Sequence, residues 1–159
     1  MFRTGIGFDA HALVEGLPLV IGGVNIPHSK GLLGHSDADV LVHAIMDAIL
    51  GAVALGDIGE HFPDTEDEFQ GADGMELLSR VQKMIEEKGY YFENLDSIII
   101  AEKPKLKTFL GEMRENLASI LKINIDQLSI KATTTELMGF TGREEGIAAQ
   151  AIVLLKSNN

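Results

Sequence analysis

The sequence feature that most constrains the fold is a helical pattern of apolar residues between about residues 37 and 54. Ser36 and Asp39, three positions apart, match a capping box at the start of this pattern. The apolar positions that follow recur every three or four residues: Val40, Leu41, Ala44, Ile45, Ala48, Ile49 and Ala52. This spacing predicts a helix with one buried stripe, which must pack against another layer of structure.

Strand-like and helical patterns alternate along the rest of the chain. Apolar or alternating segments predict strands at 4–9, 17–27 with a break at Gly22–Gly23, 95–104, 128–136 and 146–155. Amphipathic patterns predict two more helices, at 75–88 and about 105–121, whereas 56–74 is rich in Gly and Asp and predicts a long loop. Strands alternating with three helices predict an α/β (α+β) sandwich, in which a mixed sheet has the helices on one face.

Composition limits the kind of protein and the kind of site. The chain has 159 residues, 45% of them hydrophobic, which suits one domain spanning residues 1–159. It has no cysteine, so a tight transition-metal site must use histidine and carboxylate ligands. A formal net charge of −11 argues against nucleic acid or an anionic membrane as a partner. No apolar run approaches the length of a membrane span and no secretory signal is present, so we expect a cytoplasmic protein, although a processed plastid chain has the same features.

Two short stretches place metal-ligating residue types where they can converge. Asp9 and His11 lie two positions apart on a predicted strand and therefore share a face. His43 lies off the apolar stripe of the predicted helix, on the side of Asp39 and Asp47, which could orient ligands from an outer shell. One carboxylate and two imidazoles form a zinc site with an open fourth position. The alternative is a chance pattern on a surface strand and a solvated histidine on a helix.

A second unusual stretch is "KATTTELMGFTGREEGIAA" at residues 131–149. Three threonines at 133–135 precede Glu136 and a turn containing Gly139 and Gly142. Their hydroxyls and the backbone N–H groups of the turn can hold phosphate oxygens, and Glu136 can hold a hard cation such as Mg²⁺. The alternative is a Thr-rich strand followed by a Gly turn, which residue propensities alone explain.

Several separate motifs together resemble one enzyme family. They are "GFDAH" at 7–11, the segment 21–64 from "IGGVNIP" to "EHFPD", "IIAEKPK" at 99–105, "KATTTE" at 131–136 and "GFTGREEGIAAQA" at 139–151. In this order and spacing they closely resemble the 2-C-methyl-D-erythritol 2,4-cyclodiphosphate synthase family of the non-mevalonate isoprenoid pathway. Three positions depart from the pattern: Ala38 stands where Gly is frequent, and Leu137 and Glu144 are less usual.

The resemblance implies a cyclisation with release of CMP from 4-diphosphocytidyl-2-C-methyl-D-erythritol 2-phosphate. It implies zinc, or a similar divalent transition metal, at Asp9, His11 and His43, and Mg²⁺ or Mn²⁺ at Glu136. His35 and Thr134 are the implied catalytic residues, as transition-state stabilisers. The implied substrate contacts are Asp9, His11, His35, Ser36, Asp57, Gly59, Phe62, Pro63, Asp64, Thr65, Glu66, Ala101, Pro104, Lys105, Leu106, Lys107, Thr133, Thr134, Thr135, Glu136, Phe140 and Arg143.

Similar proteins form homotrimers with active sites between subunits and the sheets facing the axis. The implied axial cavity can hold an isoprenoid diphosphate near Arg143 and Glu145. The residues themselves support a partner only in part, because the sheet face carrying Ile98, Ile100 and Ala132 would otherwise stay uncovered. Two other functions remain open: a zinc hydrolase, for which no base stands beside the Asp-x-His pair, and a non-catalytic nucleotide-binding module.

Overall fold

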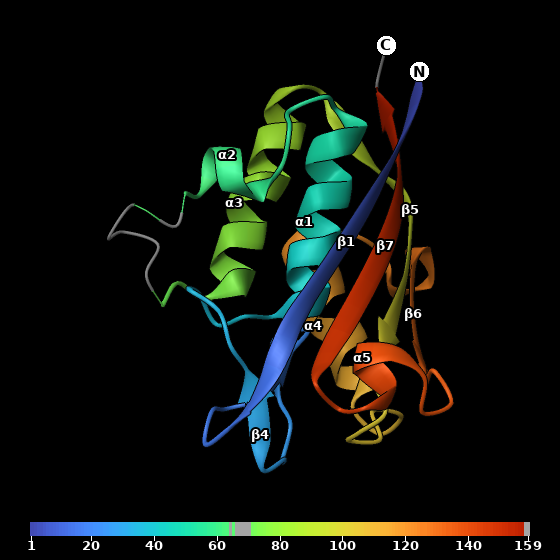
Figure 1. Ribbon diagram of the computed structural model, residues 1–159. Helices are drawn as coiled ribbons and strands as arrows, with labels where there is room; N and C mark the ends of the chain where they lie inside the picture. The colour runs from blue at the N-terminus through green and yellow to red at the C-terminus, as the bar shows by residue number, and fades with distance from the viewer. Residues whose placement is uncertain (64, 66–70, 158–159) are drawn as a thin grey trace.

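The computed structural model describes residues 1–63, 65 and 71–157 and shows a sheet with helices packed on one side (Figure 1). In this part of the chain five strands form one sheet in the order β4-β1-β7-β5-β6. Their bounds are β1 Phe2–Glu15, β4 Lys30–Leu32, β5 Tyr90–Ile100, β6 Leu128–Thr133 and β7 Gly146–Ser157. β5 and β6 are parallel and the other neighbours are antiparallel, so the predicted mixed sheet is confirmed.

Three longer helices cover one face of the sheet, as the sequence predicted (Figure 1). They are α1 Val40–Ala52, α3 Gly74–Glu87 and α4 Leu110–Leu121. The shorter helical elements were not predicted, since three or four residues carry no periodic signal: α2 Ile58–His61, η2 Ile125–Gln127 and α5 Gly139–Gly142. The hairpin of β2 Val20–Ile21 and β3 Val24–Asn25 lies within the predicted extended segment 17–27 and turns at its predicted break. None of the helices within the described residues is long and apolar enough to cross a membrane.

The element boundaries differ from the predictions where long-range pairing decides them. β1 continues to Glu15, well beyond residue 9, because it pairs with β7 from Phe2 to Ala12 and then with β4. β5 begins at Tyr90 rather than at residue 95, since β7 also pairs with its first residues. α4 begins only at Leu110, because the residues before it form a loop rather than the predicted helical turn.

The start of α1 corrects the predicted capping box. The N-cap is Asp39, whose carboxylate accepts a hydrogen bond from the Val42 N–H, so Ser36 lies outside the helix. The same carboxylate accepts from the N–H groups of Gly22 and Gly23 at 2.9 and 2.8 Å. These three donors and complete burial explain why the chain enters the helix at Asp39.

α1 is buried around most of its surface rather than along one stripe. Eleven of its thirteen residues are buried, because the sheet covers one side and α3, α2 and β2 contact others. His43 lies off the predicted stripe but is only 7% exposed, so the alternative of a solvated helix histidine does not hold. The spacing of apolar residues identified the strongest apolar stripe of this helix, but it could not show which other elements cover the rest of its surface.

β1 and α1 approach each other so closely that only glycine fits between them. A Cβ atom at Gly5 would lie 1.9 Å from the carbonyl oxygen of Ala48, and one at Gly7 would lie 1.9 Å from that of Ala44. The contact brings the strand that carries Asp9 and His11 next to the helix that carries His43.

We expect Gly7→Ala to destabilise the fold by about 3 kcal/mol, because α1 must move off β1 to admit the methyl group. Gly51→Ala is the matched control: Gly51 is an exposed residue of α1, and a methyl group added there would have no neighbouring atom within 4 Å. That variant should gain about 0.5–1 kcal/mol from helix propensity. Urea unfolding measures both, and a Gly7→Ala variant as stable as the wild type would disprove the close contact.

The sheet face opposite the helices remains apolar and exposed. Ile6 and Phe8 of β1 are 62% and 57% exposed, and Ile152, paired with Ile6, is 51% exposed. Ile98 and Ile100 are half-buried, and Ala132 is exposed. An apolar surface of this kind on a sheet is typical of a protein–protein contact.

Candidate functional site

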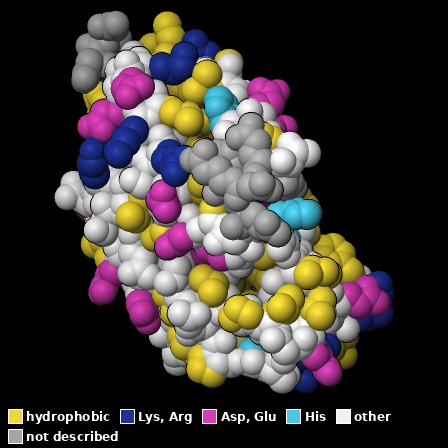
Figure 2. All heavy atoms as spheres, turned by 90° about the vertical axis from the view of Figure 1, so that its left-hand side faces the viewer, with side chains coloured by type: hydrophobic (Ala, Val, Ile, Leu, Met, Phe, Trp, Pro, Cys, Tyr) yellow, Lys and Arg dark blue, Asp and Glu magenta, His cyan; other side chains and the backbone are white. Residues whose placement is uncertain are grey.

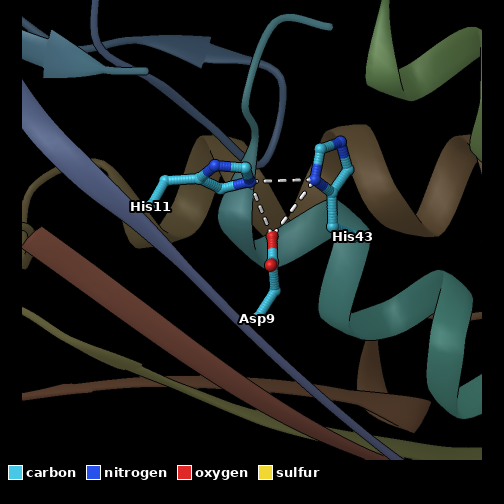
Figure 3. A group of neighbouring side chains, drawn as sticks. All are labelled: Asp9, His11 and His43. Atoms are coloured by element: carbon cyan, nitrogen blue, oxygen red, sulfur yellow. Dashed lines mark hydrogen bonds and ion pairs between the residues drawn. The ribbon is translucent and has the colours of Figure 1, made fainter. Parts of the chain in front are cut away.

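Three side chains from β1 and α1 converge on one point (Figure 3). Asp9 Oδ2 lies 2.8 Å from His11 Nε2 and 3.1 Å from His43 Nδ1, and the two ring nitrogens are 3.2 Å apart. Tetrahedral zinc, with bonds of about 2.0–2.2 Å, holds its ligand atoms about 3.3 Å apart. The structure therefore brings together the three residues expected from the sequence, at separations that suit one divalent metal ion.

The hydrogen bonds of His11 leave it suited to a metal. Its Nδ1 lies 2.9 Å from the Leu33 carbonyl oxygen, which can only accept, so Nδ1 carries the proton. In the neutral ring Nε2 then presents a lone pair toward the Asp9 carboxylate. Two such electron-rich groups 2.8 Å apart require a proton or a metal ion between them.

The electrostatics of Asp9 and His11 agree with this geometry. Burial raises the pKa of Asp9, but hydrogen bonds from His11 and His43 and their charges outweigh it, so the pKa lies well below its usual value. Burial lowers the pKa of His11, yet the hydrogen bond and charge of Asp9 prevail and raise it. Asp9 is therefore an anion at neutral pH, ready to serve as a ligand.

The outer contacts of the triad are not those expected from the sequence. Asp39 does not orient a ligand ring, because its oxygens accept from three backbone N–H groups. Burial raises its pKa to about 6, although these donors oppose the shift. Asp47 accepts from the Ile58 N–H at 2.9 Å, at the start of α2. The rings instead contact Leu33 and Ser36, whose hydroxyl lies 3.1 Å from His43 Nε2.

A cavity of about 620 Å³ opens beside the triad, large enough for a phosphorylated small molecule. Figure 2 views the molecule from the side of α2 and α3, where histidine side chains reach the surface among hydrophobic and acidic ones. The lining includes seven of the predicted site residues: Asp9, His11, His35, Ser36, His43, Gly59 and Phe62.

A second, smaller hollow of about 160 Å³ collects most of the predicted nucleotide contacts. Its lining is Ala101, Pro104, Lys105, Leu106, Lys107, Ala132, Thr133 and Thr134. The parallel pairing of β5 with β6 places the ends of these strands side by side, which brings segment 101–107 next to the threonines. The two cavities share no lining residue, so the structure gathers the predicted site residues into two separate groups within one chain.

The threonine turn holds its shape through its own hydroxyls. Thr134 Oγ1 donates to Glu136 Oε1 at 2.9 Å, and Thr135 Oγ1 lies 2.9 Å from Thr141 Oγ1. Glu136 is exposed, and no group of three or more metal-ligating side chains includes it among the residues described. Its role as a cation ligand therefore stays a prediction that needs oxygen ligands from elsewhere.

The remaining predicted residues that the structure describes line neither of the two cavities, and two others lie outside the described part of the chain. Asp57 caps α2 by accepting from the Glu60 N–H, and Pro63 and Thr65 follow that helix. Asp64 and Glu66 lie outside the described residues. Phe140, in α5, is 43% exposed. Arg143 forms a two-point ion pair with Glu145, at 2.9 and 3.0 Å, so its guanidinium already has a partner.

The positions that depart from the family pattern share one backbone property. Ala38, Leu137 and Glu144 have φ angles of 55°, 66° and 57°, in the left-handed region that glycine adopts most easily. Ala38 lies against Gly34 of the larger cavity's lining, and the other two flank α5. This conformation costs an L-residue about 1–2 kcal/mol, so a glycine at any of these three positions would relieve local backbone strain.

Comparisons with known proteins find relatives over nearly the whole chain. The family model of the YgbB family matches residues 2–156. A 2-C-methyl-D-erythritol 2,4-cyclodiphosphate synthase from Bacillus licheniformis is 61% identical over 156 residues, 98% of this chain and 99% of the relative.

Solved structures share the fold. The bifunctional IspDF of Campylobacter jejuni superposes with a TM-score of 0.95 at 45% identity, covering 100% of this chain and 43% of that one, so this chain spans less than half of the bifunctional protein. An IspF from Plasmodium falciparum, in a CDP complex, gives a TM-score of 0.87 at 33% identity, covering 99% and 97% of the two chains. The motifs, the fold and the 61% identity over 98% of the chain agree. This chain therefore belongs to the YgbB family, together with these cyclodiphosphate synthases.

Proposed function

We propose that this chain catalyses the reaction for which its relatives are named, a phosphorus–oxygen lyase step of isoprenoid biosynthesis. The substrate is 4-diphosphocytidyl-2-C-methyl-D-erythritol 2-phosphate, and the products are 2-C-methyl-D-erythritol 2,4-cyclodiphosphate and CMP. The observation that carries the proposal is the Asp9–His11–His43 triad beside a cavity, in a chain 61% identical to a synthase of that name.

The chemistry needs positioning more than a nucleophilic side chain. An oxygen of the 2-phosphate forms a bond to the β-phosphorus, while the bond from that phosphorus to the oxygen bridging the α-phosphate breaks and CMP leaves. The attacking oxygen is already anionic, so no serine, cysteine or dedicated base is required. Catalysis then depends on holding the two phosphates in line and neutralising their charge.

The chain must supply cations locally, because its formal net charge is −11. Asp9, His11 and His43 would hold zinc or a similar divalent transition metal, and Glu136 would hold Mg²⁺ or Mn²⁺. When bound, such ions act as Lewis acids on phosphate oxygens. Lys105 and Lys107 add positive charge at the smaller hollow, which would take the cytidine diphosphate.

Donor side chains complete the proposed site. His35 is exposed at the larger cavity, and Thr134 lies at the smaller one. Both would stabilise charge on the transferring phosphoryl group, in line with the roles that the family resemblance implies.

The complete site would lie between subunits of a homotrimer. Two observations support this part of the proposal: the cavities share no lining residue within one chain, and the sheet face with Ile6, Phe8 and Ile152 is apolar and exposed. The triad cavity of one subunit would then face the nucleotide hollow and Glu136 of the next. An isoprenoid diphosphate in the axial cavity would meet Arg143 in its ion pair with Glu145.

Phosphorus NMR of the cytidyl substrate with purified protein, zinc and Mg²⁺ tests the proposed reaction. We expect the signals of a cyclic diphosphate and of CMP to grow together. A linear hydrolysis product would identify a metal hydrolase instead. An unchanged spectrum would point to a nucleotide-binding module, and either result rejects the proposal.

A further inference from the structure

The segment from Leu33 to Ser36 contacts both imidazole rings of the triad on the sides away from the converging ligand atoms. The Leu33 carbonyl accepts from His11 Nδ1 at 2.9 Å, and the Ser36 hydroxyl lies 3.1 Å from His43 Nε2. Between them, a Cβ atom at Gly34 would lie only 3.1 Å from His11 Cε1. One short segment therefore forms an outer shell around both candidate metal ligands.

The hydroxyl of Ser36 can serve His43 in two directions. In a neutral ring with its proton on Nδ1, that proton faces Asp9, and Ser36 donates to Nε2. In the other tautomer Nδ1 is free for a metal, and Nε2 donates to Ser36. A hydroxyl suits both states because it is donor and acceptor at once.

With a metal on His43 Nδ1, both acceptor positions of the Ser36 hydroxyl would be filled, and only its O–H would remain free to donate. The ring N–H then occupies one lone pair of the hydroxyl oxygen, and the Ala38 N–H, 3.3 Å away, occupies the other. A hydroxyl oxygen has two lone pairs, so the O–H must point to a third group. Ser36 lines the large cavity, and there an anionic ligand would be the acceptor.

We propose that Ser36 is a positioning residue that allows the metal-binding tautomer of His43, and that metal binding turns its hydroxyl into a donor toward an anion in the cavity. The inference rests on the proposed metal site. Loss of the Ser36–His43 hydrogen bond should therefore lower both the affinity for the metal and the affinity for the anion.

Ser36→Ala should weaken Co²⁺ binding about tenfold, because the ring then keeps its proton on Nδ1, toward Asp9, and must release it before a metal can bind. Two matched variants should keep the wild-type affinity. Ser119→Ala removes an exposed hydroxyl on α4, and His35→Ala removes an exposed side chain adjacent in sequence and lining the same cavity. Absorption of the Co²⁺ complex gives the dissociation constants.

Two further measurements separate positioning from general damage to the segment. In ¹⁵N-histidine NMR of the zinc-loaded wild type, we expect the His43 proton on Nε2. In zinc-saturated protein, inorganic phosphate should bind several-fold more weakly to Ser36→Ala than to Ser119→Ala.

The outcomes separate the metal site, the positioning role of Ser36 and the donor role of its hydroxyl. If Ser36→Ala binds Co²⁺ as tightly as the wild type, the inference is overturned although the metal site stands. If His35→Ala loses as much Co²⁺ affinity as Ser36→Ala, the inference is also overturned. Unchanged phosphate binding overturns the donor role of the hydroxyl. A wild type that binds no stoichiometric Co²⁺ overturns the proposed metal site itself.

Discussion

His43→Ala is expected to lose its stoichiometric zinc and to turn over at least about a thousandfold more slowly than the wild type. The substitution removes one of three candidate ligands, and a bound metal supplies several kcal/mol of charge stabilisation in phosphoryl transfer. Asp9 and His11 would remain 2.8 Å apart, with too few ligands for tight binding.

The variant also tests the burial of this residue. Because His43 is 7% exposed, its removal leaves a small cavity in the core, and we expect a cost of about 1–3 kcal/mol in the free energy of unfolding. Far-UV circular dichroism should still show the folded chain.

Elemental analysis after gel filtration in metal-free buffer measures the zinc. The control is His28→Ala, which removes a half-buried histidine that lines neither cavity and should leave metal content and turnover unchanged. One zinc per chain and normal turnover in His43→Ala would show that the ligand assignment is wrong.

If the chain forms the proposed homotrimer, mixed assemblies of two inactive variants should regain about a quarter of the wild-type activity. His43→Ala removes the triad half of the proposed site and Glu136→Ala removes the other half. If chains assort at random, an intact triad half meets an intact Glu136 half with probability one half times one half. The separate linings of the two cavities within one chain motivate this expectation.

The experiment unfolds both variants together in equal amounts and refolds them with zinc and Mg²⁺. Native mass spectrometry with a mass tag on one variant verifies that subunits have exchanged. Each variant refolded alone is the control and should stay inactive. If exchange is complete and the mixture remains inactive, every site carries a lesion, and the active site lies within a single chain.

Local rules were sufficient for the longer elements and for part of the triad. The three- and four-residue spacing of apolar positions predicted α1 to within a few residues, because a helix repeats every 3.6 residues whatever it packs against. Asp9 and His11 share a face of β1 for an equally local reason, the two-residue repeat of a strand.

Contacts between distant segments were beyond such rules. Asp39 rather than Ser36 caps α1 because its carboxylate also reaches Gly22 and Gly23, seventeen and sixteen residues away. The left-handed backbone at Ala38 coincides with a departure from the family pattern, beside the segment where the resemblance implied roles for His35 and Ser36.

The sequence by itself determined which residue types could bind a metal, since without cysteine only histidine and carboxylate were available. Only the tertiary structure decided that His43 is buried and that Ser36 and Leu33 contact the rings, because these contacts join segments that β1, β4 and α1 bring together. The physical reason is that secondary structure follows from repeats of a few residues, whereas burial and side-chain partners depend on which layers pack against each other.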